Sequence, residues 1–203
     1  MNWRIITGAL LSLAASTQCG FATDPRYPDW PCAQGKVPEI SLVAVWAGPS
    51  LDDVQDRWKD DARISALVTK LAARRTPLEE AEKDVEAFLA DSPAKVTSGK
   101  LLFAGLFDTL NAQRSSVMMG LERVTRKQRE AAEKIRSETI DLQGLQSTSP
   151  PDQSKIDELS NQLLWETRIF EDRRRVVKYV CEVPTEIDRR LFALGRTIQQ
   201  QLK

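Results

Sequence analysis

The sequence of 203 residues contains no histidine and only three cysteines. The missing imidazole removes the usual general base at neutral pH, the commonest zinc ligand and any Ser-His-Asp triad. No CxxC or CxxCH pattern is present, which disfavours thioredoxin-like redox chemistry and covalent haem. The sequence therefore predicts no enzyme, no catalytic residue, no metal site and no cofactor. A hydrolase that uses carboxylates alone remains an alternative.

Acidic pairs are the remaining candidates for a cation site. They are Asp52/Asp53, Asp60/Asp61 and the cluster Glu79/Glu80/Glu82. Each falls in a predicted helix, without the glycine and backbone carbonyl ligands that calcium loops use. Solvated helix faces explain these residues better than a metal site.

Long hydrophobic runs are also lacking, apart from one near the start of the chain. Arg4 precedes an apolar stretch, Ile5–Ala15, and small residues follow in Ser16–Ala22. This order predicts a secretory signal peptide, residues 1–22, because eleven residues are too short to span a bilayer as a helix. A membrane anchor is the alternative. A lipoprotein through Cys19 is disfavoured, because Gln18 before the cysteine is not small.

No excess of charge of either sign is present. The chain has 29 basic and 29 acidic residues, and removal of residues 1–22 takes away one basic residue, Arg4, for a net charge of −1. Such a balance gives no general attraction for nucleic acid or an anionic membrane. We therefore expect no nucleic acid partner, and we do not expect an integral membrane protein.

Two cysteines, Cys32 and Cys181, follow the predicted signal peptide. In an exported protein such a pair is most simply a disulfide, and two inert buried thiols are the alternative. A crosslink over so long a loop contributes about 4–5 kcal/mol in the chain-entropy model.

A proline-rich stretch, residues 23–49, predicts an extended N-terminal arm, because proline at this density prevents a regular helix. Its aromatic residues need a buried environment. Together with Trp58, the tryptophans of the arm allow two interpretations. Their side chains either pack the arm against the helices or form an aromatic pocket for a small ligand. The three tryptophans concerned are Trp30, Trp46 and Trp58.

Apolar residues recur at alternating steps of three and four from Phe103 to Leu145 and again from Ile156 to Ile198. Their mean spacing of 3.5 residues is that of a coiled-coil seam. A polar turn near Ser149 predicts two antiparallel helices, in which facing seam positions have residue numbers that sum to 301. Glu166 is then expected to reach Lys134. A slip by one heptad is the alternative register.

Three Ser/Thr-x-x-acid motifs predict helix starts, because the hydroxyl caps an orphan backbone N–H and the acid suits the helix N-terminus. They begin at Ser50, Thr76 and Ser149, and predict helices to about Ala73, Ala90 and Gln201. A further helix starts within residues 93–100 and runs to about Gln146. Pro184 falls inside the last helix, where a kink is expected rather than a termination.

The apolar face broadens around residues 101–119, and Phe192 lies across from it. A wider stripe needs more than one neighbouring helix. The predicted fold class is all-α: a long antiparallel coiled-coil hairpin, residues 121–180, with a four-helix base, residues 50–120 plus 181–203. A monomer is the default, and the flanking leucines leave a dimer open.

Basic residues concentrate halfway along the predicted hairpin, with a local net charge of +4 after four neighbouring acids are subtracted. One interpretation is a docking site for an acidic partner, a phosphate-bearing envelope lipid or a glycan polyanion. The other is an ordinary helix surface with i,i+4 ion pairs. We call this set the basic belt: Arg123, Arg126, Lys127, Arg129, Arg173, Arg174, Arg175 and Lys178.

A long projecting hairpin without catalytic chemistry favours an interaction protein. The first hypothesis is an exported, periplasmic helical scaffold, adaptor or holdase-like factor that binds an unknown protein partner in the cell envelope. The alternative is a small-ligand-binding module with an aromatic pocket under the N-terminal arm.

Overall fold

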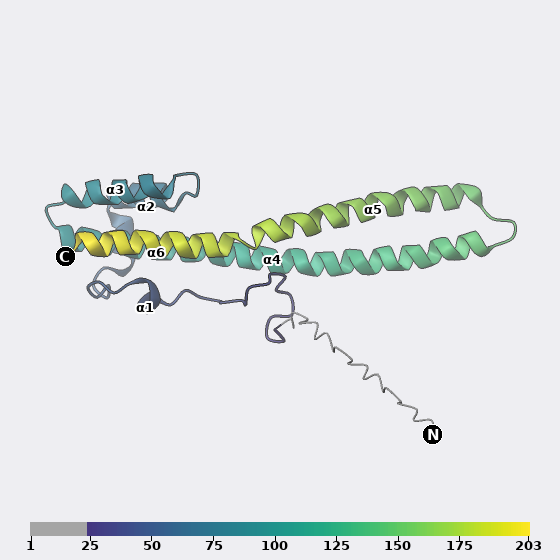
Figure 1. The fold of residues 1–203 in the computed structure, drawn as a ribbon, viewed down its shortest axis with the longest axis horizontal. Helices are drawn as coiled ribbons and strands as arrows, with labels where there is room; N and C mark the ends of the chain where they lie inside the picture. Colours follow the sequence, from purple (N-terminus) through teal and green to yellow (C-terminus); the bar gives the residue numbers. More distant parts are fainter. Residues whose placement is uncertain (1–23) are drawn as a thin grey trace, which may run out of the picture.

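The computed structural model describes residues 24–203, and the predicted signal peptide and Cys19 lie outside the described residues. The all-α prediction is confirmed, because no strand occurs within this range. Two long helices dominate: α4 (Lys95–Ser147) and α5 (Gln153–Val180). They run side by side in opposite directions, joined by the turn at residues 148–152 (Figure 1).

Contacts between α4 and α5 lie close to the predicted register. Nζ of Lys134 lies 2.6 Å from Oε1 of Glu166, so the predicted reach of Glu166 is confirmed. Nε2 of Gln162 donates to Oε1 of Glu138 at 2.8 Å. The residue numbers of both pairs, 134 and 166 or 138 and 162, sum to 300. This is one short of the expected 301, whereas a slip by one heptad would change the sum by seven.

Three further helices pack at one end of α4: α2 (Ala62–Ala72), α3 (Leu78–Ala90) and α6 (Val183–Gln201) (Figure 1). Their apolar faces form one core with the N-terminal part of α4. The α4/α5 pair extends away from this end. The main buried residues of the core are Ile64, Val68, Leu71, Val85, Leu89, Leu102, Phe103, Leu106, Leu110, Ile187, Leu191, Leu194 and Ile198.

The predicted helix start at Ser50 is wrong. Residues 51–54 form turns, a 3₁₀ helix η1 spans Gln55–Asp60, and α2 begins at Ala62. Oδ1 of Asp61 caps α2 by accepting from the backbone N–H groups of Arg63 and Ile64. The Ser50 hydroxyl instead accepts from the N–H of Asp52 within a turn.

The start predicted at Thr76 lies one residue before the observed N-cap and that at Ser149 three residues before it, and neither hydroxyl is the cap. Oγ1 of Thr76 donates to the carbonyl of Lys70 at 3.1 Å, and α3 begins at Leu78. At α5 the capping group is the Asp152 carboxylate, which accepts from the N–H of Lys155.

The predicted single helix to Gln201 is divided, because α5 ends at Val180 and α6 begins at Val183. Cys181 and Glu182 keep right-handed helical torsion angles. Pro184 has no N–H to donate to the carbonyl of Val180, so the hydrogen-bond ladder is interrupted there. The direction of the chain changes at this break (Figure 1).

The N-terminal arm, residues 24–49 of the described chain, runs along α4 and α6 and contains the short helix α1 (Leu42–Val45). Several long-range contacts hold it. Arg114, only 3% exposed, donates to the carbonyl of Pro38 and lies 2.7 Å from Oδ1 of Asp188 on α6. Burial raises the pKa of Asp188, and the guanidinium of Arg114 opposes that shift. One buried cation thus joins the arm, α4 and α6.

Candidate functional site

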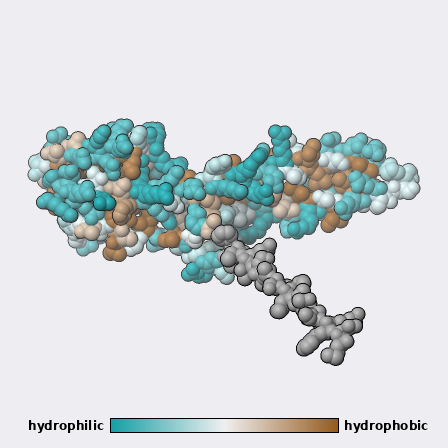
Figure 2. Space-filling view, viewed as in Figure 1, coloured by the Kyte–Doolittle hydropathy of each residue, from teal (hydrophilic) through white to brown (hydrophobic). Residues whose placement is uncertain are grey.

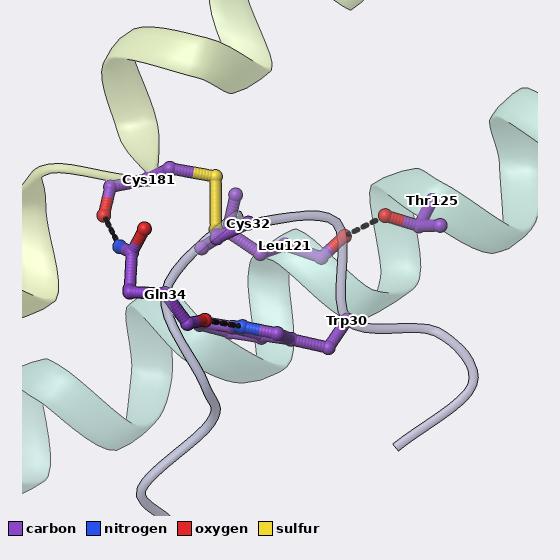
Figure 3. The surroundings of a disulfide bond; sticks show 6 residues. All are labelled: Trp30, Cys32, Gln34, Leu121, Thr125 and Cys181. Atoms are coloured by element: carbon purple, nitrogen blue, oxygen red, sulfur yellow. Dashed lines mark hydrogen bonds between the residues drawn. A yellow bond between two sulfur atoms is a disulfide. The ribbon is translucent and has the colours of Figure 1, made fainter. Parts of the chain in front are cut away.

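The predicted Cys32–Cys181 disulfide is present and joins residues 149 positions apart (Figure 3). Cys181 lies in the break between α5 and α6, where the backbone carbonyl is not used by the helix. Nε2 of Gln34 donates to this carbonyl at 2.5 Å. The disulfide therefore fastens the N-terminal arm at the point where the last helix changes direction.

Two residues of the basic belt hold the arm beside the disulfide. The carboxylate of Asp29 forms one ion pair with Arg126 at 2.9 Å and another with Arg129 at 2.7 Å. Arg129 also donates to the carbonyl of Pro28. Sequence reasoning missed Asp29, because a single acid between proline and tryptophan has no periodic pattern to mark it.

Two more belt residues pair within their own helix: Arg174 with Glu171, and Arg175 with Asp172. Such exposed i,i+3 pairs contribute little to stability. Within residues 24–203, the other four belt residues have no ion pair. They are Arg123, Lys127, Arg173 and Lys178.

The pKa of Asp29 gives a direct test of how the arm docks. Hydrogen bonding from Arg126, followed by that from Arg129, holds the pKa of this carboxyl below its ordinary value. Because its pKa is lowered in the folded state, the ionised Asp29 carboxylate stabilises the docked arm at pH values above its pKa in the unfolded chain. This contribution is lost as the pH falls through the pKa of the folded state. Replacing both arginines by glutamine is expected to return the Asp29 pKa to its ordinary range, measured by carboxyl ¹³C NMR titration.

A matched control replaces Arg174 and Arg175 by glutamine, since these pair with acids of α5 itself. The control should leave the Asp29 titration unchanged. An unchanged titration in the Arg126/Arg129 variant would mean that Asp29 is not held by these two guanidinium groups.

An apolar cavity of about 520 Å³ lies between α4 and α5. Most of its lining is aliphatic. Gly120 leaves open space beside α4, since a Cβ at this position would meet no atom within 4 Å. Two unpaired belt residues, Arg123 and Arg173, also line the cavity, together with Asp172. The apolar lining consists of Val117, Gly120, Leu121, Val124, Val176, Val177 and Val180.

A second cavity of about 290 Å³ continues toward the α4–α5 turn. It shares Arg173 with the first, and Trp165 stands at its wall with 63% of its surface exposed. The remaining lining residues are Ala131, Lys134, Ile135, Glu166, Ile169 and Phe170.

The three tryptophans occupy different surroundings. Trp30 donates to the carbonyl of Gln34 beside the disulfide (Figure 3). Trp46 stacks on Phe103 with ring centroids 4.2 Å apart. Trp58 donates to Oδ2 of Asp108 at 3.0 Å. All three indole N–H groups have a partner, since that of Trp46 donates to the carbonyl of Pro49 at 2.8 Å.

A cavity of about 330 Å³ lies near Trp58, but its lining includes none of the three tryptophans. It contains three carboxylates, Asp52, Asp56 and Asp108, beside Leu42 and Phe107. The structure therefore does not bring Trp30, Trp46 and Trp58 together around this space.

In residues 24–203 no helix is long and apolar enough to cross a membrane, and no group of three or more Cys, Asp or Glu side chains is arranged to hold a metal ion. Comparison of the chain with protein-family models, curated proteins and solved structures finds no match.

Proposed function

We propose that this protein is an exported, periplasmic interaction factor, a scaffold, adaptor or holdase-like accessory protein that binds a protein partner through its α4/α5 pair. In this proposal the pair is a coiled-coil hairpin that projects from a four-helix base formed by α2, α3, α6 and the N-terminal part of α4. The N-terminal arm braces the point where hairpin and base meet.

Exposed apolar side chains on the projecting pair carry the proposal. Large contiguous apolar patches are rare on the surface of monomeric proteins, and they mark interaction sites or ligand grooves. Apolar residues lie among the polar ones along this part of the molecule (Figure 2). Those of the pair that are largely exposed are Met119, Ile140, Leu164, Trp165, Val176 and Tyr179.

The disulfide supports export. Such bonds form and persist in oxidising compartments such as the bacterial periplasm, and are rare in the cytosol. The Cys32–Cys181 bond closes most of the described chain into one loop, and an oxidising compartment would let it form and persist.

Shortening the pair by matched heptads tests the proposal. Residues 132–145 face residues 155–168 in the observed register, so removing both segments keeps the remaining helix contacts aligned. The deletion spares the disulfide and the contacts of Arg126 and Arg129 with the N-terminal arm. Partners recovered from an envelope extract by the full protein are expected to be lost from the shortened one, as measured by quantitative mass spectrometry.

Circular dichroism and thermal unfolding serve as the folding control for the shortened protein. Recovery of the same partners by a folded, shortened protein would exclude residues 132–145 and 155–168 as the binding element, and would end the proposal for the distal half of the pair.

A further inference from the structure

The seam between α4 and α5 has two sides, and they differ in what covers them. On one side lies a cavity of about 340 Å³, which Pro31 of the N-terminal arm helps to line. The other side carries the cavities of about 520 and 290 Å³, and no arm residue lines either. We call the second side the open groove.

The covered side illustrates the kind of segment that this hairpin binds. There Pro31 of the arm lines one cavity with Phe170 and Val177, and Asp29 bridges Arg126 and Arg129. An apolar contact and a carboxylate held by two guanidinium groups are thus used together. Carboxylate–guanidinium pairs add direction and specificity to such a contact.

The open groove also combines apolar side chains with guanidinium groups, but no carboxylate of the described residues pairs with Arg123 or Arg173. Val176, 58% exposed, and Trp165 present apolar surface to water. Arg173 borders both cavities and has no ion pair within the described residues. The acids beside it are already engaged, since Asp172 pairs with Arg175 and Glu166 with Lys134.

These charges disfavour a second copy of the chain as the occupant. In a two-fold interface each patch faces its own copy. Arg173 lies near the middle of the open groove, so such a pairing would bring like guanidinium groups together. An acidic occupant gains the opposite interaction.

The shape of the open groove favours a helix over an acyl chain. It follows two straight helices from Val117 to Ile135 of α4, about 27 Å at the α-helical rise per residue. A third helix laid along this path covers Val176 and Trp165, whereas a single acyl chain leaves much of the width in water. Gly120 permits a helix to approach α4 closely.

We propose that the open groove binds an acidic amphipathic helix of about five turns from a partner protein, with its apolar face on the valines and its carboxylates at Arg173 and Arg123. This rests on the proposed function and names the surface and the partner chemistry. The complex is a local three-helix bundle with charge pairs at the edges.

Blocking the open groove at Gly120 tests the proposal without disturbing the fold. A Cβ at Gly120 or at Gly144 meets nothing within 4 Å, so a side chain can leave the backbone into open space at either position, and both lie in α4. Gly120 lines the groove and Gly144 lines neither of its cavities. Gly120→Gln is expected to weaken binding about tenfold or more, and Gly144→Gln is expected to leave it unchanged.

The probes are two synthetic peptides of about 18 residues, long enough to span the groove as a helix. They share one leucine face and carry either glutamate or lysine at the flanking positions. Fluorescence anisotropy with the intact, oxidised protein measures binding. The glutamate peptide should bind more tightly than the lysine peptide, and Arg173→Glu should reverse this preference.

Equal binding of both peptides, or unchanged binding of the glutamate peptide to Gly120→Gln, would overturn the proposal. So would a concentration-dependent dimer in sedimentation that Gly120→Gln dissociates, because the occupant is then a second copy. Binding to anionic phospholipid vesicles that Gly120→Gln abolishes, without binding of the glutamate peptide, would assign the groove to a lipid.

The heptad deletion and Gly120→Gln together distinguish failure of the open-groove proposal from failure of the proposed function. If envelope partners are lost on heptad deletion but kept by Gly120→Gln, the hairpin binds through another surface. If Gly120→Gln loses partners that the shortened protein keeps, the 520 Å³ cavity suffices and the distal hairpin is not needed.

Discussion

Replacing both Cys32 and Cys181 by serine is expected to lower the free energy of unfolding by about 4–5 kcal/mol in the chain-entropy model. The bond closes a loop between residues 149 positions apart, and removing it restores that freedom to the unfolded chain. For a domain of this size, a loss of this order lowers the melting temperature by about 10–20 °C. Thermal unfolding followed by circular dichroism measures the change.

The wild-type protein with a reductant provides the matched comparison. It should melt at about the temperature of the double-serine variant, which should itself be insensitive to the reductant. A melting temperature within a few degrees of the oxidised protein, about 1 kcal/mol or less, would contradict the prediction. The contacts of Asp29 and Gln34, and the ion pair between Lys36 and Glu122 of α4 at 2.5 Å, would then suffice to hold the N-terminal arm.

The disulfide and the long helices were predictable because their signals are simple. Two cysteines remain once residues 1–22 are set aside, which leaves one pairing. Apolar spacing of 3.5 residues extends over many turns of α4 and α5, so their existence does not depend on any single residue. The observed ends, at Ser147 and Gln153, follow from the polar turn between them.

Local capping motifs were less informative, because several side chains compete for the same role. Ser50 fits a capping motif, yet Asp61 caps α2 eleven residues later. The segment between them is turned so that Trp58 reaches Asp108 on α4. A contact fifty residues apart in sequence thus overrides the local signal, and no window of neighbouring residues contains it.

The basic belt shows the same limit at the candidate site. Its eight residues looked alike in sequence, but the N-terminal arm uses Arg126 and Arg129, while Arg123 and Arg173 border the cavity. The path of the proline-rich arm decides which of these arginines are paired. That path cannot be predicted from the sequence, because the arm has no periodic pattern. The open groove was likewise visible in sequence only as Gly120 and a row of valines.

Phe103 is the side chain at which the arm, α4 and α6 meet. It is fully buried, stacks on Trp46 of the arm at 4.2 Å, and lies beside Phe107 with ring centroids 6.3 Å apart. Gly195 of α6 provides the space for it, since a Cβ at Gly195 would lie 2.7 Å from Cε2 of Phe103.

Phe103→Ala is expected to lower the free energy of unfolding by about 3–5 kcal/mol, through lost burial and the cavity left behind. Phe192 is the matched control. Its place across from the apolar face of α4 suggested burial, but α6 turns it outward and it is 50% exposed. Phe192→Ala should therefore change stability by less than about 1 kcal/mol. Equal effects of the two substitutions in urea unfolding would mean that the packing of Trp46, Phe103 and Gly195 does not anchor the arm.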